Sequence, residues 1–98
     1  MATWTKQPQE REGNYFFSGR FYVTRGVTRE LSLEEIVFIC QDLSRFVLQE
    51  NGADYLQVYT DEQERKLFFI DQLSKEMIES GQFQPDDNYC TLLWSHEY

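Results

Sequence analysis

The clearest pattern of apolar and polar positions covers residues 31–52 and predicts an α-helix. Apolar residues recur there every three or four positions, which is the spacing of one buried helix face. Ser32, followed three residues later by Glu35, is the signature of a capping box at a helix start. Asn51 and Gly52 suit the left-handed conformation that ends many helices. The predicted buried face consists of Leu33, Ile36, Ile39, Cys40, Leu43, Phe46 and Val47.

Alternating apolar and polar positions predict four β-strands. The second and third are separated by a short acidic loop, so we expect them to form a β-hairpin. Leu56 and Val58 of the second strand are expected to face the core. Tyr55, Gln57 and Tyr59 are then expected to face outward. The predicted strands cover residues 15–23, 54–60, 65–70 and 89–95.

A second, shorter helix is predicted for residues 71–80, with Asp71 as its N-terminal cap and Gly81 after its end. The order β-α-β-β-α-β is that of a ferredoxin-like α+β fold, a four-stranded antiparallel sheet with both helices on one face. Because the second helix has barely three turns, a β-meander with one main helix is the alternative. Residues 1–14 lack periodicity and predict a flexible N-terminal arm, which leaves residues 15–98 as a single domain.

The formal net charge of −8 is unevenly distributed along the chain. Residues 1–29 carry a net charge of +3, whereas residues 30–98 carry −11. An acidic body repels nucleic acid and anionic membrane, so direct binding to either is not expected. Two interpretations remain open: a surface charge that serves solubility, or a surface that binds a basic partner.

Membrane and redox signals point to a reducing, aqueous environment. No apolar run approaches the ~20 residues that cross a membrane, and the first residues do not resemble a signal peptide. Cys40 and Cys90 lie in apolar surroundings and are expected to be buried free thiols. We therefore expect a cytoplasmic protein.

Residue types that carry catalysis or bind metal are few in this chain. His96 is the only histidine, and on an extended strand it would point away from the face of Cys90. Structural zinc needs about four ligands, which these residues do not supply. The acidic residues 61–64 lack the alternating oxygen ligands of a calcium loop, and residues 65–71 lack the spacing of an RNA-binding motif. We therefore expect no enzyme and no cofactor.

Three short segments carry a resemblance to known proteins: residues 22–27, with Thr-Arg-Gly-Val at their end, residues 54–59, and residues 91–98. They resemble small bacterial proteins found on plasmids and phages, which have a Thr-Arg-Gly-Val segment near the front and an aliphatic strand that ends in Glu-Tyr. Trp94 and His96 depart from that pattern. Because the function of those proteins is unknown, the resemblance implies a mobile-element setting and no activity.

The leading hypothesis is a non-enzymatic protein that binds a basic protein surface. In a mobile-element setting, its sharper version is an inhibitor of a host nucleic-acid-handling defence enzyme, with an acidic surface that mimics DNA. The alternatives are a small regulatory or ligand-binding domain, with a pocket between the sheet and the N-terminal arm, and a homodimer joined through exposed sheet faces. The predicted protein-binding residues are Phe38, Glu34, Glu35, Asp42, Tyr55, Tyr59, Asp61, Glu62, Glu64, Asp86 and Asp87.

Overall fold

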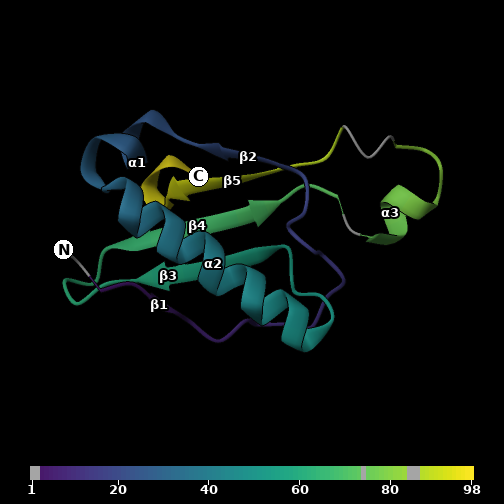
Figure 1. Cartoon of the computed structure of the whole chain (residues 1–98), viewed down its shortest axis with the longest axis horizontal. Helices are drawn as coiled ribbons and strands as arrows, with labels where there is room; N and C mark the ends of the chain where they lie inside the picture. The colour runs from purple at the N-terminus through teal and green to yellow at the C-terminus, as the bar shows by residue number, and fades with distance from the viewer. Residues whose placement is uncertain (1–2, 74, 84–86) are drawn as a thin grey trace.

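The computed structural model describes residues 3–73, 75–83 and 87–98, and a five-stranded mixed sheet forms its centre (Figure 1). The strands are β1 (Thr5–Lys6), β2 (Arg20–Val23), β3 (Leu56–Thr60), β4 (Lys66–Asp71) and β5 (Tyr89–Trp94). The helices are α1 (Arg25–Glu30), α2 (Leu33–Glu50) and α3 (Lys75–Glu79), and a 3-10 turn, η2 (Ser95–Glu97), follows β5. The strands lie in the order β1-β3-β4-β5-β2, and only the β2–β5 pair is parallel.

Helix α2 begins and ends as its sequence predicts. The Ser32 hydroxyl accepts a hydrogen bond from the Glu35 amide at 3.1 Å, and the Glu35 carboxylate accepts one from the Ser32 amide at 3.0 Å. Asn51 adopts the left-handed cap conformation. The predicted inner face is confirmed from Ile36 to Val47, but Leu33 is 75% exposed. Neither α2 nor any other described helix is long and apolar enough to cross a membrane.

Helix α2 crosses one face of the sheet, in front of β3 and β4 (Figure 1). The alternation predicted for β3 is present, but the assignment of its two sides is wrong. Gln57 and Tyr59 face the helix and are buried, whereas Leu56 and Val58 lie on the opposite face and are only half-buried. The Tyr59 hydroxyl donates to Asp42 Oδ2 at 2.9 Å, and Gln57 Nε2 donates to the Asp54 carbonyl oxygen at 2.9 Å, whereas the buried Gln57 Oε1 has no hydrogen-bond partner among the described residues.

The α+β class is confirmed, but the four-stranded antiparallel ferredoxin-like sheet is wrong. A crossover between β4 and β5 would need a helix about as long as the strands. Helix α3 has five residues and rises about 7.5 Å, whereas the six residues of β4 extend about 20 Å. Strand β5 therefore returns antiparallel beside β4, so that β3, β4 and β5 form a meander.

Residues 3–14 pack against the domain, which differs from the flexible arm expected there. Trp4 is buried, and its indole Nε1 donates to Glu35 Oε2 at 2.8 Å. The Trp4 ring lies 6.0 Å from the ring of Trp94. Strand β1 then adds an antiparallel edge to β3. A single tryptophan and a two-residue strand have no periodicity, so the pattern of the sequence could not show this docking.

Two further segments differ from their predicted structures. Strand β2 starts only at Arg20, because Phe17 adopts a left-handed φ of 52° that interrupts an extended strand. Asp71 ends β4 instead of capping a helix, and its Oδ2 accepts a hydrogen bond from the Phe17 amide at 2.9 Å. Helix α1 was not predicted; Thr24 caps it, and Val27 anchors it in the core.

Candidate functional site

Several of the predicted binding residues are used inside the fold. Glu35 is buried between Trp4 and the start of α2, where burial opposes its ionisation but hydrogen bonds from Ser32 and Trp4 lower its pKa. Asp42 accepts the hydrogen bond of the buried Tyr59. Glu35 and Tyr59 therefore do not belong to an exposed binding surface.

Asp61 organises the loop between β3 and β4. Its Oδ1 accepts hydrogen bonds from the amides of Gln63 at 3.0 Å and Arg65 at 2.8 Å, and its Oδ2 pairs with Arg65 Nε at 2.7 Å. Burial would raise the pKa of Asp61, but the bonds from Arg65 and the loop amides outweigh it and lower that pKa. The carboxylate thus serves the turn rather than a cation.

The other predicted carboxylates that the structure describes are exposed and come from different elements. Glu34 lies in the first turn of α2, and Glu62 and Glu64 lie at the tip of the β3–β4 loop. Asp87 is exposed at the end of the long β4–β5 connection, two residues before β5 begins. Asp86 lies outside the described residues.

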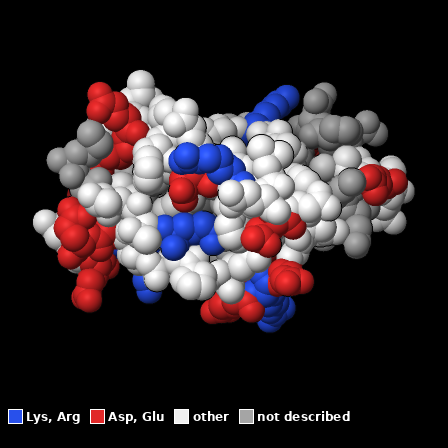
Figure 2. Space-filling view, turned by 60° about the horizontal axis from the view of Figure 1, so that its bottom comes forward, with Lys and Arg blue, Asp and Glu red and all other residues white. Residues whose placement is uncertain are grey.

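One end of the molecule brings exposed acidic side chains together. Glu30 and Glu64 line the same cavity of about 410 Å³, although they come from α1 and the β3–β4 loop. Arg65 and Lys66 also line this cavity, so its charge is mixed. Figure 2 shows acidic side chains gathered at this end of the molecule, at the left of the view. We call the exposed carboxylates of this end the acidic end: Glu30, Glu34, Glu62 and Glu64.

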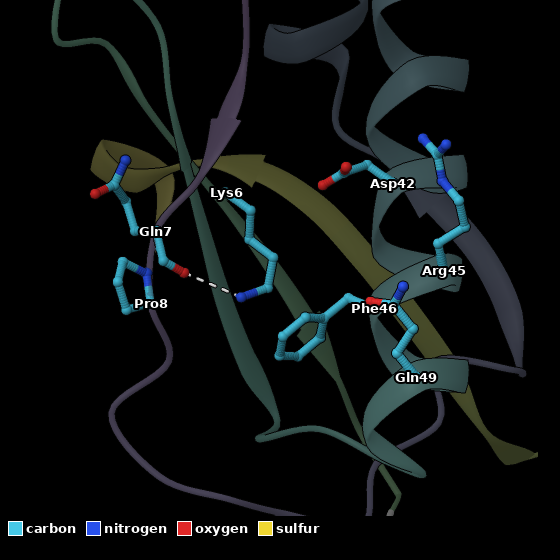
Figure 3. Close-up of a pocket in the computed structure, with 7 residues that line it drawn as sticks. All are labelled: Lys6, Gln7, Pro8, Asp42, Arg45, Phe46 and Gln49. Atoms are coloured by element: carbon cyan, nitrogen blue, oxygen red, sulfur yellow. Dashed lines mark hydrogen bonds between the residues drawn. The ribbon is translucent and has the colours of Figure 1, made fainter.

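A cleft of about 540 Å³ lies between the N-terminal segment and the second half of α2 (Figure 3). Lys6 enters it from β1, and Asp42, Arg45 and Phe46 enter it from the helix. The Lys6 ammonium lies 3.8 Å from the Phe46 ring centroid and donates to the Gln7 carbonyl oxygen at 3.0 Å. Burial lowers the pKa of Lys6, although Asp42 and Glu50 act in the opposite direction. Figure 2 shows basic side chains near the middle of the face, with an acidic side chain between them.

The sheet face opposite α2 carries a groove of about 520 Å³ rich in tyrosine. Four tyrosines line it, and Ile70, Thr91 and Leu93 come from the strands beneath. Just after η2, the Tyr98 ring lies over this face, 5.7 Å from the ring of Phe68. We call this feature the tyrosine groove; its four rings belong to Tyr15, Tyr55, Tyr89 and Tyr98.

Sequence reasoning missed the tyrosine groove. It did suggest a pocket at the N-terminal arm, but placed it against the sheet, whereas the cleft described above lies between that arm and α2. Tyr55 was selected as an outward aromatic, and it does line the groove. Phe38, the other predicted aromatic contact, is 43% exposed on the outer side of α2, far from any strand in sequence. The sequence does place tyrosines just before or after the strands. That pattern identifies the groove only when it is known which sheet face α2 covers.

The thiols and the histidine are poorly suited to nucleophilic chemistry. Burial raises the pKa of Cys90 to about 12 and also raises the pKa of Cys40, so both thiols stay protonated near neutral pH. Neither forms a disulfide. The His96 ring stacks on Trp94 at 6.2 Å between centroids. Within the described ranges, no three His, Cys, Asp or Glu side chains form a group that could hold a metal ion.

Comparison with known proteins adds no assignment. The chain matches no protein-family model, no curated protein and no solved structure at a significant level. Its function has to be inferred from the acidic end, the cleft and the tyrosine groove.

Proposed function

We propose that this chain is a non-enzymatic interaction protein that binds a basic protein surface. The acidic end is the observation that carries this proposal, because its carboxylates come from three elements and are all exposed. Like charges gathered on one surface raise the rate and the selectivity of association with a partner of opposite charge. The net charge of −8 acts in the same direction at longer range.

A sharper form of the proposal is DNA mimicry within a mobile element. A protein with exposed carboxylates can occupy the basic groove of a nucleic-acid enzyme, where phosphate contacts dominate affinity. The buried positions of Glu35 and Asp61 remove them from the mimicking surface. The acidic end, rather than the whole acidic body, would then take the place of the phosphates, and the protein would act in the cytoplasm of the host cell.

Capture of partners from a bacterial lysate at low and high salt tests this proposal. The immobilised chain is expected to retain a basic nucleic-acid-handling protein at low salt and to release it at high salt. The double variant Glu62→Lys/Glu64→Lys should lose that capture. The matched control Glu10→Lys/Glu12→Lys makes the same change in net charge at exposed positions outside the acidic end. Equal capture by the two double variants would rule out the acidic end as the binding surface.

The cleft beside α2 supports a second candidate function, the binding of a small polar molecule. Lys6 and Arg45 supply positive charge from opposite sides, and Asp42 supplies a carboxylate (Figure 3). A volume of about 540 Å³ lies within the ~300–1,000 Å³ typical of ligand sites. Arg45→Gln should abolish binding of small anions in a thermal-shift screen while it leaves partner capture unchanged. An unchanged screen in that variant would remove the cleft from consideration.

A further inference from the structure

The tyrosine groove is a second surface whose chemistry differs from that of the acidic end. It lies over β4 and β5 on the sheet face that α2 leaves uncovered. The apolar residues of this face are only half-buried, among them Phe68, Ile70 and Leu93. A half-buried apolar sheet face bordered by exposed aromatic rings is typical of a binding surface.

Pairs of aromatic rings hold the walls of the groove in place. Tyr15 and Tyr55 lie 6.1 Å apart between centroids, and their planes are tilted by 57°. On the β2 side, Tyr89 makes an edge-on contact with Tyr22 at 5.6 Å. Such contacts stabilise each ring beyond the burial of its area and limit the conformations that it adopts. The groove therefore presents rigid aromatic faces, which lose little entropy when they bind a partner.

The charged residues that line the groove are both acidic. Asp71, at the end of β4, is only 2% exposed and its Oδ2 accepts a hydrogen bond from the Phe17 amide. Glu97 in η2 is therefore the accessible carboxylate of the groove. Hydrogen bonds from the Trp94 amide and the Thr24 hydroxyl lower the pKa of Glu97, so this carboxylate is ionised at neutral pH. Arg20 of β2 is the backbone partner of the groove residue Tyr89 in β5.

We propose that the tyrosine groove binds arginine side chains of a basic polypeptide segment. A guanidinium group stacks on aromatic faces and forms charge-assisted hydrogen bonds with carboxylates, and this groove offers both. The cavity of about 520 Å³ accommodates extended side chains. This inference rests on the proposed function, because it identifies the class of partner segment and the place where that segment binds.

A second copy of the chain is the main competing occupant of this face. Two uncovered sheets packed face to face would bury the same apolar residues. That packing would also bury the exposed Glu97 of both copies without a basic partner inside the groove. Burial of unpaired charge is costly, so the charge of the groove favours a cationic segment over a second copy.

Titration calorimetry with a capped tetra-arginine peptide tests this inference on the full chain. Wild-type protein is expected to bind the peptide, whereas a capped tetra-glutamate peptide should not bind. Tyr98→Ala and Tyr89→Ala should each weaken binding about fivefold, which corresponds to ~1 kcal/mol for one cation–π contact. Tyr98 is 72% exposed, so its removal leaves the fold intact.

Phe38→Ala removes an exposed ring from the outer side of α2 and should not change the affinity. Arg20→Glu should tighten binding by removing a like charge from the strand position opposite Tyr89.

The outcomes separate this inference from the proposed function. Equal affinities for Tyr98→Ala, Tyr89→Ala and Phe38→Ala would overturn the groove as the arginine site. If light scattering instead shows a dimer that Tyr89→Ala dissociates, and that dimer fails to bind the peptide, the face belongs to a second copy of the chain. Glu62→Lys/Glu64→Lys should still bind the peptide through the groove even where it no longer captures a partner. If this variant loses partner capture but still binds the peptide, the result bears on the acidic end and leaves the groove as the arginine site.

Discussion

Glu97 connects two segments that lie more than seventy positions apart in the sequence. Its Oε1 accepts hydrogen bonds from the Thr24 hydroxyl and the Trp94 amide, both at 2.8 Å. A Cβ atom on Gly26 would lie 2.7 Å from Glu97 Oε2, so glycine is needed there while Glu97 keeps this position. The Thr-Arg-Gly segment and the closing Glu-Tyr, which carried the resemblance to mobile-element proteins, thus contact each other.

Gly26→Ala tests this contact in a double-mutant cycle with Glu97→Ala. Alanine is normally better than glycine in a helix by about 0.5–1 kcal/mol. With Glu97 present, the new methyl group should displace the carboxylate and cancel or reverse that gain. In the Glu97→Ala background the same substitution should stabilise the protein. Urea unfolding of the four proteins measures the coupling, and a coupling energy near zero would show that Gly26 and Glu97 act independently.

Two buried carboxylates predict opposite dependences of stability on pH. The lowered pKa of Asp61 means that its contribution is present above the unfolded pKa and is lost as the pH falls through the folded pKa. Burial raises the pKa of Asp71, despite hydrogen bonds from Phe17 and Gln72, so ionised Asp71 lowers stability as the pH rises through that pKa.

The variants Asp61→Asn and Asp71→Asn separate these contributions. Asp61→Asn should reduce the free energy of unfolding more at about pH 7 than at about pH 3. Asp71→Asn should do the reverse, because the acid form of Asp71 is the one that burial favours. Urea unfolding at the two pH values provides both differences. If the change in unfolding free energy were larger at the same pH for both variants, the opposite environments assigned to these carboxylates would be contradicted.

Helix α2 is the element that its local sequence specifies most completely. Its capping box, its left-handed end and its inner face all involve residues within one or two turns of each other. The strands are different, because alternation identifies a strand without saying which side a helix will cover. Gln57 and Tyr59 face α2 because the register pairs them with Phe69 and Leu67 of β4, and that pairing is set far along the chain. The helix predicted over residues 71–80 is present only as the shorter α3, Lys75–Glu79, and Asp71 accepts a hydrogen bond from the Phe17 amide instead of capping it.

Leu43→Ala and Leu48→Ala form a matched test of α2. Leu43 is 1% exposed on the inner face, whereas Leu48 is 79% exposed on the outer face. Removal of the buried side chain should reduce the free energy of unfolding by about 2–5 kcal/mol. The same substitution at Leu48 should change it by less than about 0.5 kcal/mol. Equal melting temperatures for the two variants would refute this placement of the helix.

At the scale of the whole molecule, the chain exposes two chemically different surfaces and a basic cleft. The overall acidity was evident from composition, and the exposed Glu34, Glu62 and Glu64 could be selected from sequence. The tyrosine groove could not, because its rings come from positions 15 to 98 and meet only through the order of the strands. Both surfaces suit a basic partner, and the acidic end can guide a segment whose arginines then enter the groove.

The central claim is that the uncovered sheet face, rather than the helix face, binds a basic segment. Titration of isotopically labelled protein with capped tetra-arginine, followed through backbone amide shifts, tests it most directly. We predict that the largest shifts fall on β4, β5 and the residues around Tyr55, with small shifts along α2. Shifts concentrated around Phe38, or in the cleft that contains Lys6 and Arg45, would contradict the claim.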